Sequence, residues 1–486
     1  MHLGDLASAD LALDPGARAI EIGGLSSDSR AVGRGFLFAA LSGSTTDGAR
    51  YIGDAISHGA AALLVDRKTA VPASAGVVVL RSDDPRRELS LMAARLYPRQ
   101  PDRLVAITGT SGKTSVAAFA RQIFAAAGHE AASIGTIGIV SRRWSTYSGL
   151  TTPDPIALHG ILDRLAGEGV THAALEASSH GLDQRRLDGI RIAAAGFTNL
   201  GRDHMDYHAT VADYFAAKLR LFVTILPKEG TAVVDMDGAR SETVAAVARE
   251  RGQGLIRIGR RGSELRLIDL AASGFRQRLR IDAFGRLIDV VLPLAGAFQA
   301  SNALVAAGLA IAAGVPAEEA VASLAHLEGT PGRLELVGHK ANGAMIFIDY
   351  AHKPEALVSA LSALRPFTTG RLVVVFGAGG DRDPGKRLLM GRAAAEHADV
   401  VIVTDDNPRS EDPGEIRRAV MTGAPNAIEI GDRGRAIAEA IAMLAAGDVL
   451  CIAGKGHETG QIIGGEVIPF SDHHAVRTVL SAEVAA

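Results

Sequence analysis

The residues best suited to chemistry form a short glycine-containing segment in the first third of the chain. Its members combine two glycines, a lysine and hydroxyl side chains: Gly109, Thr110, Ser111, Gly112, Lys113, Thr114 and Ser115. Residues 104–107 predict a buried strand, and an alanine-rich helix is expected from Ser115 onward. A strand, a glycine turn and a helix N-terminus direct backbone N–H groups at phosphate oxygens. The segment predicts a nucleoside triphosphate site, with Lys113 at the outer phosphates and Thr114 on Mg²⁺.

This loop is shorter than the common P-loop. That pattern places four residues between its first glycine and the Gly-Lys pair, whereas here only Thr110 and Ser111 separate Gly109 from Gly112. The alternative interpretation is an ordinary strand–helix turn with an incidental lysine. The strand and helix expected on either side favour a phosphate site.

Three further features of the central part of the chain could serve that site. Residues 171–175 predict a strand that ends at Glu176, where an open α/β sheet presents Mg²⁺ ligands; a helix-capping glutamate is the alternative. Two histidines and two aspartates within residues 203–208 indicate metal or phosphate chemistry. Lys218 lies on an amphipathic helical pattern over residues 214–222, and this local pattern predicts a solvated lysine.

Polar clusters also follow the strands expected in the last third of the chain. Residues 344–348, 371–376, 399–404 and 449–453 each predict a strand that ends in charged or glycine-rich residues. In doubly wound sheets the carboxyl edge of the strands binds ligands. The glycine-rich turn at 377–383 lacks a G-x-G-x-x-G pattern, so it is weak support for a dinucleotide loop.

Composition indicates a multidomain α/β protein. A length of 486 residues predicts about three domains, which turn-rich stretches place at 1–98, 99–329 and 330–486. The net charge of −3, without a basic stripe, argues against nucleic acid as a partner. The single cysteine, Cys451, excludes a disulfide framework and suits a reducing cytosol. The absence of a secretory signal pattern and of a spanning apolar run predicts a cytoplasmic protein without membrane insertion.

Taken together, the motifs resemble the Mur ligase family over essentially the whole chain. The resemblance lies in GTSGKTS at 109–115, EASSHGLDQRR at 176–186, NLGRDHMDYH at 199–208 with a lysine fourteen residues after His204, and DYAHKPEAL at 349–357. The tetrapeptide DNPR at 406–409 is similar to that of members attaching meso-2,6-diaminopimelate to UDP-N-acetylmuramoyl-L-alanyl-D-glutamate. The resemblance implies an ATP-dependent, bacterial, cytoplasmic ligase of peptidoglycan precursor synthesis that acts as a monomer.

The family fold implied by this resemblance has three α/β domains. These are a small N-terminal uridine-nucleotide domain, a central P-loop-type parallel-sheet ATPase domain and a C-terminal Rossmann-like domain that binds the amino acid. ATP contacts beyond residues 109–115 are implied for Asn302, Arg333, Asp349 and His352. Two Mg²⁺ ions are implied at Thr114, Glu176, His204 and a carbamate on Lys218. The implied catalytic residues are Lys113, Lys218, His204 and Asp349.

The resemblance also assigns the two substrates. The uridine nucleotide and muramoyl-dipeptide are implied to contact hydroxyl, amide and guanidinium groups: Ser27, Ser29, Ser44, Thr45, Thr46, Thr151, Thr152, Ser178, Gln184 and Arg186. Diaminopimelate is implied to contact Arg382, Asp406, Asn407, Pro408, Arg409, Gly454 and Glu458. Arginine forks pair with a carboxylate and acidic groups accept from an ammonium, whereas L-lysine lacks the distal carboxylate and would leave buried arginine charge unpaired.

Several departures and rivals accompany this hypothesis. Leu150, Ser111 and Lys353 stand where the family commonly has Asn, Asn and Thr. The same ligase using L-lysine is one alternative. Folylpolyglutamate synthase is another, although it lacks a separate uridine-nucleotide domain. A P-loop switch or motor is the rival from another class, and it leaves the DNPR and GKGHE clusters without a role.

Overall fold

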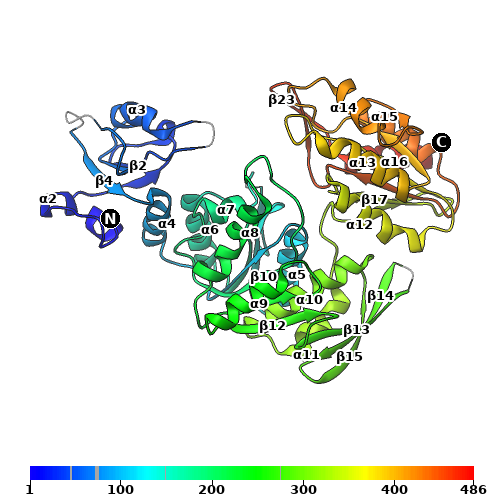
Figure 1. Ribbon diagram of the computed structural model, residues 1–486, viewed down its shortest axis with the longest axis horizontal. Coiled ribbons are helices and arrows are strands. Elements are labelled where there is room, and N and C mark those ends of the chain that lie inside the picture. Colours follow the sequence, from blue (N-terminus) through cyan, green and yellow to red (C-terminus); the bar gives the residue numbers. More distant parts are fainter. Residues whose placement is uncertain (44–45, 72–75, 148, 274, 486) are drawn as a thin grey trace.

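The computed structural model describes residues 1–486 except 44–45, 72–75, 148, 274 and 486. Three sheets follow one another along the chain (Figure 1). The first is parallel, with strand order β1 (Gly24–Ser26), β2 (Phe36–Ala39), β3 (Ala62–Asp66) and β4 (Val78–Ser82). Short helices surround it: α1 (Leu3–Leu6), α2 (Pro15–Arg18) and α3 (Ile52–Ser57). The longer helix α4 (Pro85–Leu96) leads out of this unit and packs on α6 (Pro155–Gly167) of the next.

The second sheet has eleven strands and a parallel centre. The parallel strands, in spatial order, are β12 (Gly254–Gly259), β11 (Thr231–Asp235), β10 (Ile192–Phe197), β5 (Arg103–Thr108), β9 (His172–Glu176) and β6 (Ala131–Gly135). At one edge β13 (Leu265–Ser273) pairs parallel with β12 and continues into antiparallel β14 (Arg276–Ala283) and β15 (Arg286–Leu292). At the other edge lie antiparallel β7 (Gly138–Ser141) and β8 (Ser145–Thr146).

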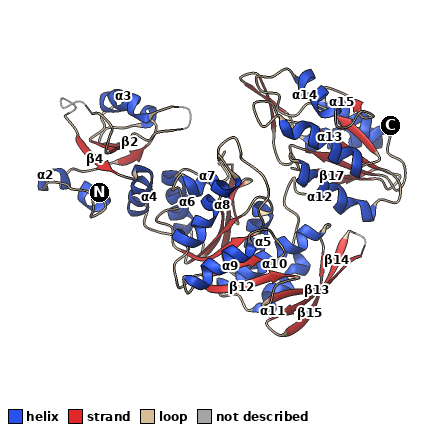
Figure 2. Cartoon of the chain, viewed as in Figure 1, coloured by secondary structure: helices blue, strands red, loops and turns tan. Residues whose placement is uncertain are grey.

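Helices cover both faces of this sheet (Figure 2). One face buries apolar side chains of α5 (Lys113–Ala126), α10 (Ala297–Ala312) and α11 (Ala317–Ala322). The opposite face packs against α6, α7 (Ser179–Asp183), α9 (Ser241–Glu250) and the π-helical Leu221–Ile225 that extends α8 (Val211–Arg220). Because both faces are covered, the central strands are mostly apolar and buried, as in β5, where residues 104–108 are all buried.

The third sheet has the order β16 (Glu335–His339), β17 (Met345–Asp349), β21 (Val449–Ala453), β18 (Leu372–Phe376), β19 (Val400–Val403) and β20 (Ile428–Glu429). Among the described strands of this sheet, only the edge strand β16 runs antiparallel to its neighbour. One face packs on α12 (Pro354–Leu364), α13 (Gly385–His397) and α14 (Pro413–Met421), and the other on α15 (Arg433–Ala442) and α16 (Asp472–Ala485). A hairpin of β22 (Gly460–Ile463) and β23 (Glu466–Pro469) stands outside the sheet.

The three-domain α/β fold class predicted from the sequence is confirmed. Two details differ. Helix α5 begins at Lys113, two residues earlier than expected, because Gly112 turns the chain with φ of 88°. The central sheet also carries antiparallel strands at both edges. Among the described helices, none is long and apolar enough to cross a membrane.

Candidate active site

The phosphate loop joins β5 to α5 and has room only for glycine at two positions. Gly109 has φ of 149° and Gly112 has φ of 88°, both in the region that L side chains rarely adopt. A Cβ at Gly109 would overlap the Thr198 hydroxyl, and one at Gly112 would overlap Asn302 Oδ1. The loop therefore presents bare backbone at a helix N-terminus, the arrangement that holds phosphate oxygens.

Two lysines converge on the loop from different helices. Lys113 Nζ donates to the carbonyls of Gly109 (2.9 Å) and Thr110 (3.0 Å), and Lys218 Nζ of α8 donates to the Gly109 carbonyl (2.7 Å). Lys218 is only 1% exposed, so the local prediction of a solvated lysine is wrong. Burial lowers the pKa of Lys113 to about 8, and burial together with the Lys113 charge lowers the pKa of Lys218 well below its ordinary value.

Glu176 ends β9 beside the loop. Its carboxylate accepts from the Thr114 hydroxyl (3.1 Å), the Thr136 backbone N–H (2.7 Å) and the Thr136 hydroxyl (3.1 Å). Ser178, not Glu176, caps the following helix α7, so the capping alternative is wrong. Thr136 was not anticipated from the sequence, because no motif surrounds it and only the pairing of β6 beside β9 brings it there.

The oxygen groups of Thr114 and Glu176 fit a hard divalent cation only as a partial site. Mg²⁺ prefers oxygen ligands and is usually held by one or two carboxylates together with substrate phosphates and water. Within the described part of the chain, no cluster of three or more His, Cys, Asp or Glu side chains could hold a metal. His204 Nε2 lies 3.1 Å from Asp203 Oδ2. Lys218 could contribute an anionic oxygen only as a carbamate.

A side chain of the C-terminal domain contacts the end of the phosphate loop. Arg333 Nη2 donates to the Thr114 hydroxyl (3.2 Å), and its guanidinium lies 4.4 Å from the centre of the Tyr350 ring. Asp349, at the end of β17, accepts from the backbone N–H groups of Leu334 (2.6 Å) and Ala351 (2.8 Å). Burial raises the pKa of Asp349 to about 6, against the opposing Arg333 charge. This domain is thus docked onto the loop.

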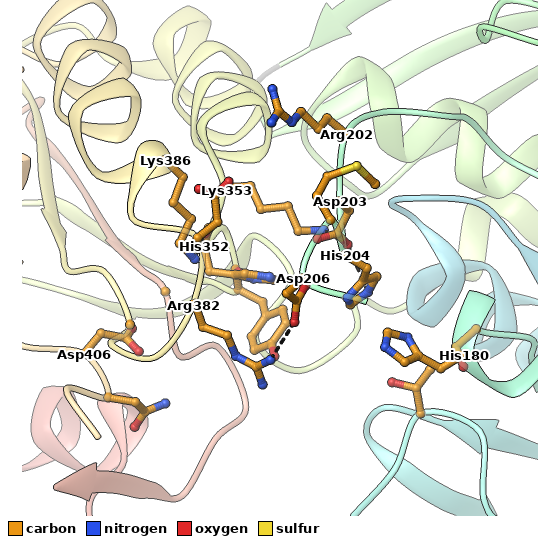
Figure 3. Close-up of a pocket in the computed structure, with 18 of the residues that line it drawn as sticks. His180, Arg202, Asp203, His204, Asp206, His352, Lys353, Arg382, Lys386 and Asp406 are labelled. Atoms are coloured by element: carbon orange, nitrogen blue, oxygen red, sulfur yellow. Dashed lines mark hydrogen bonds and ion pairs between the residues drawn. The ribbon is translucent and has the colours of Figure 1, made fainter. Parts of the chain in front are cut away.

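A cavity of about 600 Å³ lies between the central and C-terminal domains (Figure 3). The central domain lines it with hydroxyl, basic and acidic groups: Thr151, Thr152, Ser178, His180, Arg186 and residues 202–206. The C-terminal domain lines it with His352, Lys353, Arg382, Lys386, Asp406, Asn407, Arg409, Gly454 and Glu458. Burial lowers the pKa of His352 to about 3 and that of His204 to about 4, so both rings are neutral at pH 7.

The C-terminal wall contains six of the seven residues expected around diaminopimelate, and Pro408 is the one that does not line the cavity. Asn407 Nδ2 donates to Glu458 (3.1 Å), and Lys455 Nζ donates to Asn407 Oδ1 (3.0 Å) and to Glu458 (3.1 Å). Lys455 is fully buried. The sequence places it in the charged cluster after β21, but its contact with Asn407, 48 residues earlier, has no local signal.

Asp406 and the two arginines supply charge to this wall. Asp406 Oδ2 is buried without a hydrogen-bond partner in the described structure, a state that suits an incoming ammonium. Arg382 Nη1 lies 3.1 Å from Asp206 Oδ2 of the central domain (Figure 3). Arg409 has φ of 54°; its backbone N–H donates to the Ile462 carbonyl of β22 and its side chain to the Gly380 carbonyl. The hairpin thus holds Arg409 in a strained conformation.

The residues expected around the uridine-linked substrate lie partly in the cavity and partly in the N-terminal domain. Four line the cavity: Thr151, Thr152, Ser178 and Arg186. Gln184 is bonded to Arg186 through its side-chain oxygen (2.7 Å). Ser27, Ser29 and Thr46 lie in the N-terminal domain and do not line this cavity, and Ser44 and Thr45 lie outside the described residues. Leu150, one of the departures, lies on the cavity wall.

A phosphate loop that contacts the segment leading into a cavity with a charged wall is typical of ATP-dependent ligases. Models of the Mur ligase middle domain, the Mur ligase glutamate ligase domain and the Mur ligase family catalytic domain match residues 107–310, 332–456 and 21–97. The chain belongs to the Mur ligase family.

Individual relatives agree with this assignment. The UDP-N-acetylmuramoyl-L-alanyl-D-glutamate--2,6-diaminopimelate ligase of Chelativorans sp. (strain BNC1) is 58% identical and covers 96% of each chain. The ligase of that name from Bradyrhizobium diazoefficiens is 56% identical and covers 100% of each. A solved structure of a ligase of that name is 31% identical, with a TM-score of 0.72 over 100% of this chain and 99% of its own.

Proposed function

We propose that this enzyme joins meso-2,6-diaminopimelate to UDP-N-acetylmuramoyl-L-alanyl-D-glutamate, with conversion of ATP to ADP and phosphate. The observation that carries this proposal is the acceptor wall of the cavity. It combines two guanidinium groups with a buried Asp406 oxygen that has no partner among the described residues. These groups complement a distal end that carries both a carboxylate and an ammonium.

The first step activates the substrate carboxylate. A D-glutamate carboxylate oxygen attacks the γ-phosphorus of ATP, the bond to the β-phosphate oxygen breaks, and ADP leaves as an acyl phosphate forms. Lys113, Arg333 and the backbone N–H groups of residues 109–115 stabilise the charge that accumulates on the transferring phosphoryl group. Asn302, packed against Gly112, and His352 complete the nucleotide surroundings.

Two Mg²⁺ ions bound with the nucleotide would screen charge on its phosphates. Thr114 and Glu176 would hold one, and His204 with a Lys218 carbamate would serve the other. The chain's own contribution is to keep Lys218 reactive toward carbon dioxide. Because burial and the neighbouring Lys113 lower its pKa, a larger fraction of Lys218 is present as the neutral amine, which is the nucleophilic form.

The second step forms the amide. The diaminopimelate amine attacks the carbonyl carbon of the acyl phosphate, the carbon–oxygen bond to phosphate breaks, and inorganic phosphate departs with the bonding electrons. A base near His204, which lines the cavity, or near Asp349, at the end of β17, would accept the amine proton. The docked C-terminal domain excludes water and protects the acyl phosphate.

The acceptor wall explains the choice of amino acid. Arg382 and Arg409 pair with the distal carboxylate, while Asp406 and Glu458 accept from the distal ammonium. L-Lysine offers no carboxylate, so guanidinium charge in the cavity would lose its partner. The N-terminal domain, with Ser27, Ser29 and residues 44–46, holds the uridine diphosphate end. The enzyme acts as a monomer in the bacterial cytoplasm, in cell wall biogenesis and thereby in cell shape and division.

The test is product formation with purified enzyme, ATP, Mg²⁺ and the UDP-muramoyl-dipeptide. We expect mass spectrometry to find the tripeptide product with meso-diaminopimelate and none with L-lysine. Product only with L-lysine would move the chain to the lysine-adding members. ATP hydrolysis that needs neither the dipeptide nor an amino acid would contradict the ligase function.

A further inference from the structure

Lys353 bridges two domains through an ion pair that none of the proposed substrate contacts includes. It lies between β17 and α12 in the C-terminal domain, and its ammonium is 2.5 Å from Asp203 Oδ2 of the central domain. The side chains are 15% and 16% exposed, so water screens this pair less than an ordinary surface pair. Both residues line the cavity, and Figure 3 shows Lys353 extending toward Asp203.

Asp203 connects Lys353 to His204. The same carboxylate oxygen that contacts Lys353 lies 3.1 Å from His204 Nε2. His204 itself has φ of 54°, a left-handed conformation that is unfavourable for a residue other than glycine. Surrounding contacts must hold such a residue, and strain of this kind persists where the neighbouring structure over-determines it.

The C-terminal domain contacts residues 202–206 a second time. Arg382 lies 3.1 Å from Asp206, but these side chains are 53% and 45% exposed. The more exposed pair contributes less, because solvent and salt weaken it. Lys353 is therefore the stronger of the two ionic attachments between this loop and the C-terminal domain.

We propose that Lys353 is a positioning residue that fixes residues 202–206, and with them the His204 ring, when the C-terminal domain docks. This inference deepens the proposed ligase function and rests on it. Docking brings the acceptor wall to the cavity, and the same movement delivers Lys353 to Asp203. Assembly of the acceptor wall and orientation of His204 are then one event, which would delay activation of the carboxylate until the acceptor wall is present.

The first experiment measures loop order without substrates. Hydrogen exchange of amides in residues 199–210 is followed by mass spectrometry in the ligand-free full-length enzyme and in Lys353→Met. We expect exchange about tenfold faster in the variant, because Asp203 loses its partner. Lys228→Met is the matched control, since Lys228 is 78% exposed and its substitution removes the same charge elsewhere on the central domain.

Two further variants separate the ion pair from packing of the side chain. Lys353→Arg keeps the charge and should restore most of the protection. The exchanged pair Lys353→Asp with Asp203→Lys should recover protection relative to either single change. Unchanged exchange in Lys353→Met, or a double variant no better protected than both single variants, would overturn the proposal.

Kinetics distinguish positioning from direct phosphate binding. In Lys353→Met we expect kcat to fall about tenfold while KM for ATP stays within about twofold, since the lysine acts through Asp203 and His204. A rise in KM for ATP with unchanged kcat would instead make Lys353 a phosphate ligand and overturn the proposal. Failure of the wild-type enzyme to form the tripeptide would count against the ligase function, while the exchange result stands independently.

Discussion

The two parts of the candidate active site are built in different ways: the phosphate end, at the loop of residues 109–115, and the acceptor end, at the C-terminal wall of the cavity. At the phosphate end, one continuous segment from β5 to α5 supplies backbone N–H groups, and its glycines are required by the contacts of Thr198 and Asn302. At the acceptor end, side chains that follow β18, β19 and β21 meet at the edge of the third sheet. The phosphate end depends on local backbone geometry, whereas the acceptor end depends on side-chain charges brought together by the fold.

This contrast predicts separable defects. Changes at the phosphate end should abolish turnover with every acceptor, because activation precedes amide formation. Changes at the acceptor end should alter which amine is used and at what concentration, while ATP binding remains normal.

The largest effect should come from removing the phosphate-end lysine. In Lys113→Met we expect kcat to fall by about a thousandfold or more, because a charge aimed at the transferring phosphoryl group is lost. Phosphate release in the presence of both substrates measures this. The Lys228→Met control should retain full activity, and a Lys113→Met enzyme within tenfold of wild type would remove Lys113 from catalysis.

Two glycine substitutions, one at each end, test whether ATP binding and diaminopimelate binding can be impaired separately. Gly112 (φ 88°) lies in the phosphate loop after β5, and Gly454 (φ 115°) lies in the cavity wall after β21. An added Cβ would overlap Asn302 in the first case and Asp406 in the second. We expect Gly112→Ala to raise KM for ATP and Gly454→Ala to raise KM for diaminopimelate, each by about tenfold or more. Steady-state kinetics with each substrate varied is the measurement. Equal effects of both variants on both constants would show that the ends are not separable.

A smaller effect is expected at Lys455. This fully buried ammonium holds Asn407 and Glu458, so Lys455→Met should leave the Glu458 carboxylate without its bonded charge partner. We expect KM for diaminopimelate to rise about tenfold, with KM for ATP unchanged. Impaired ATP binding together with intact diaminopimelate binding in Lys455→Met would contradict the separation of the phosphate and acceptor ends.

A pH effect outside both ends should change stability and leave turnover at pH 7 unaffected. His159 of α6 is buried with Nε2 3.1 Å from the Asp188 carbonyl, and burial lowers its pKa to about 4. As pH falls from about 6.5 toward 4, His159 therefore takes up a proton in the unfolded state but not in the folded state, so the free energy of unfolding decreases. The free energy of unfolding should differ less between about pH 7.5 and pH 5 in His159→Gln than in wild type, by about 2 kcal/mol. Denaturant unfolding at both pH values is the measurement. An unchanged pH dependence would exclude His159 as its source.

The strand–turn–helix backbone of the phosphate end was predictable because its signal is local. Strand, glycine turn, lysine and helix are consecutive in the sequence, and the structure moves only the helix start. Lys218 was misjudged from its own helix because its burial depends on the Gly109 carbonyl, which lies 109 residues earlier. The role of Thr136 could not be predicted from the residues around it, because only the pairing of β6 with β9 brings it to Glu176.

The acceptor end was predictable only in part. Polar residues after successive strands indicated which edge of the sheet binds ligand, and six of the seven expected residues line the cavity. Contacts across the domain boundary could not be predicted, because no periodicity or motif states which residues of another domain will face them. The pairs of Lys353 with Asp203 and Arg382 with Asp206 are of this kind.

The most direct test of the separation between the two ends is acceptor selectivity in wild type and in Arg409→Met. The quantity is the ratio of kcat/KM for meso-diaminopimelate to kcat/KM for L-lysine, at saturating ATP and UDP-muramoyl-dipeptide. We predict a ratio above about a thousand in wild type that falls by about a hundredfold in the variant, with KM for ATP unchanged. A ratio unaffected by Arg409→Met, or lost together with ATP binding, would contradict the account.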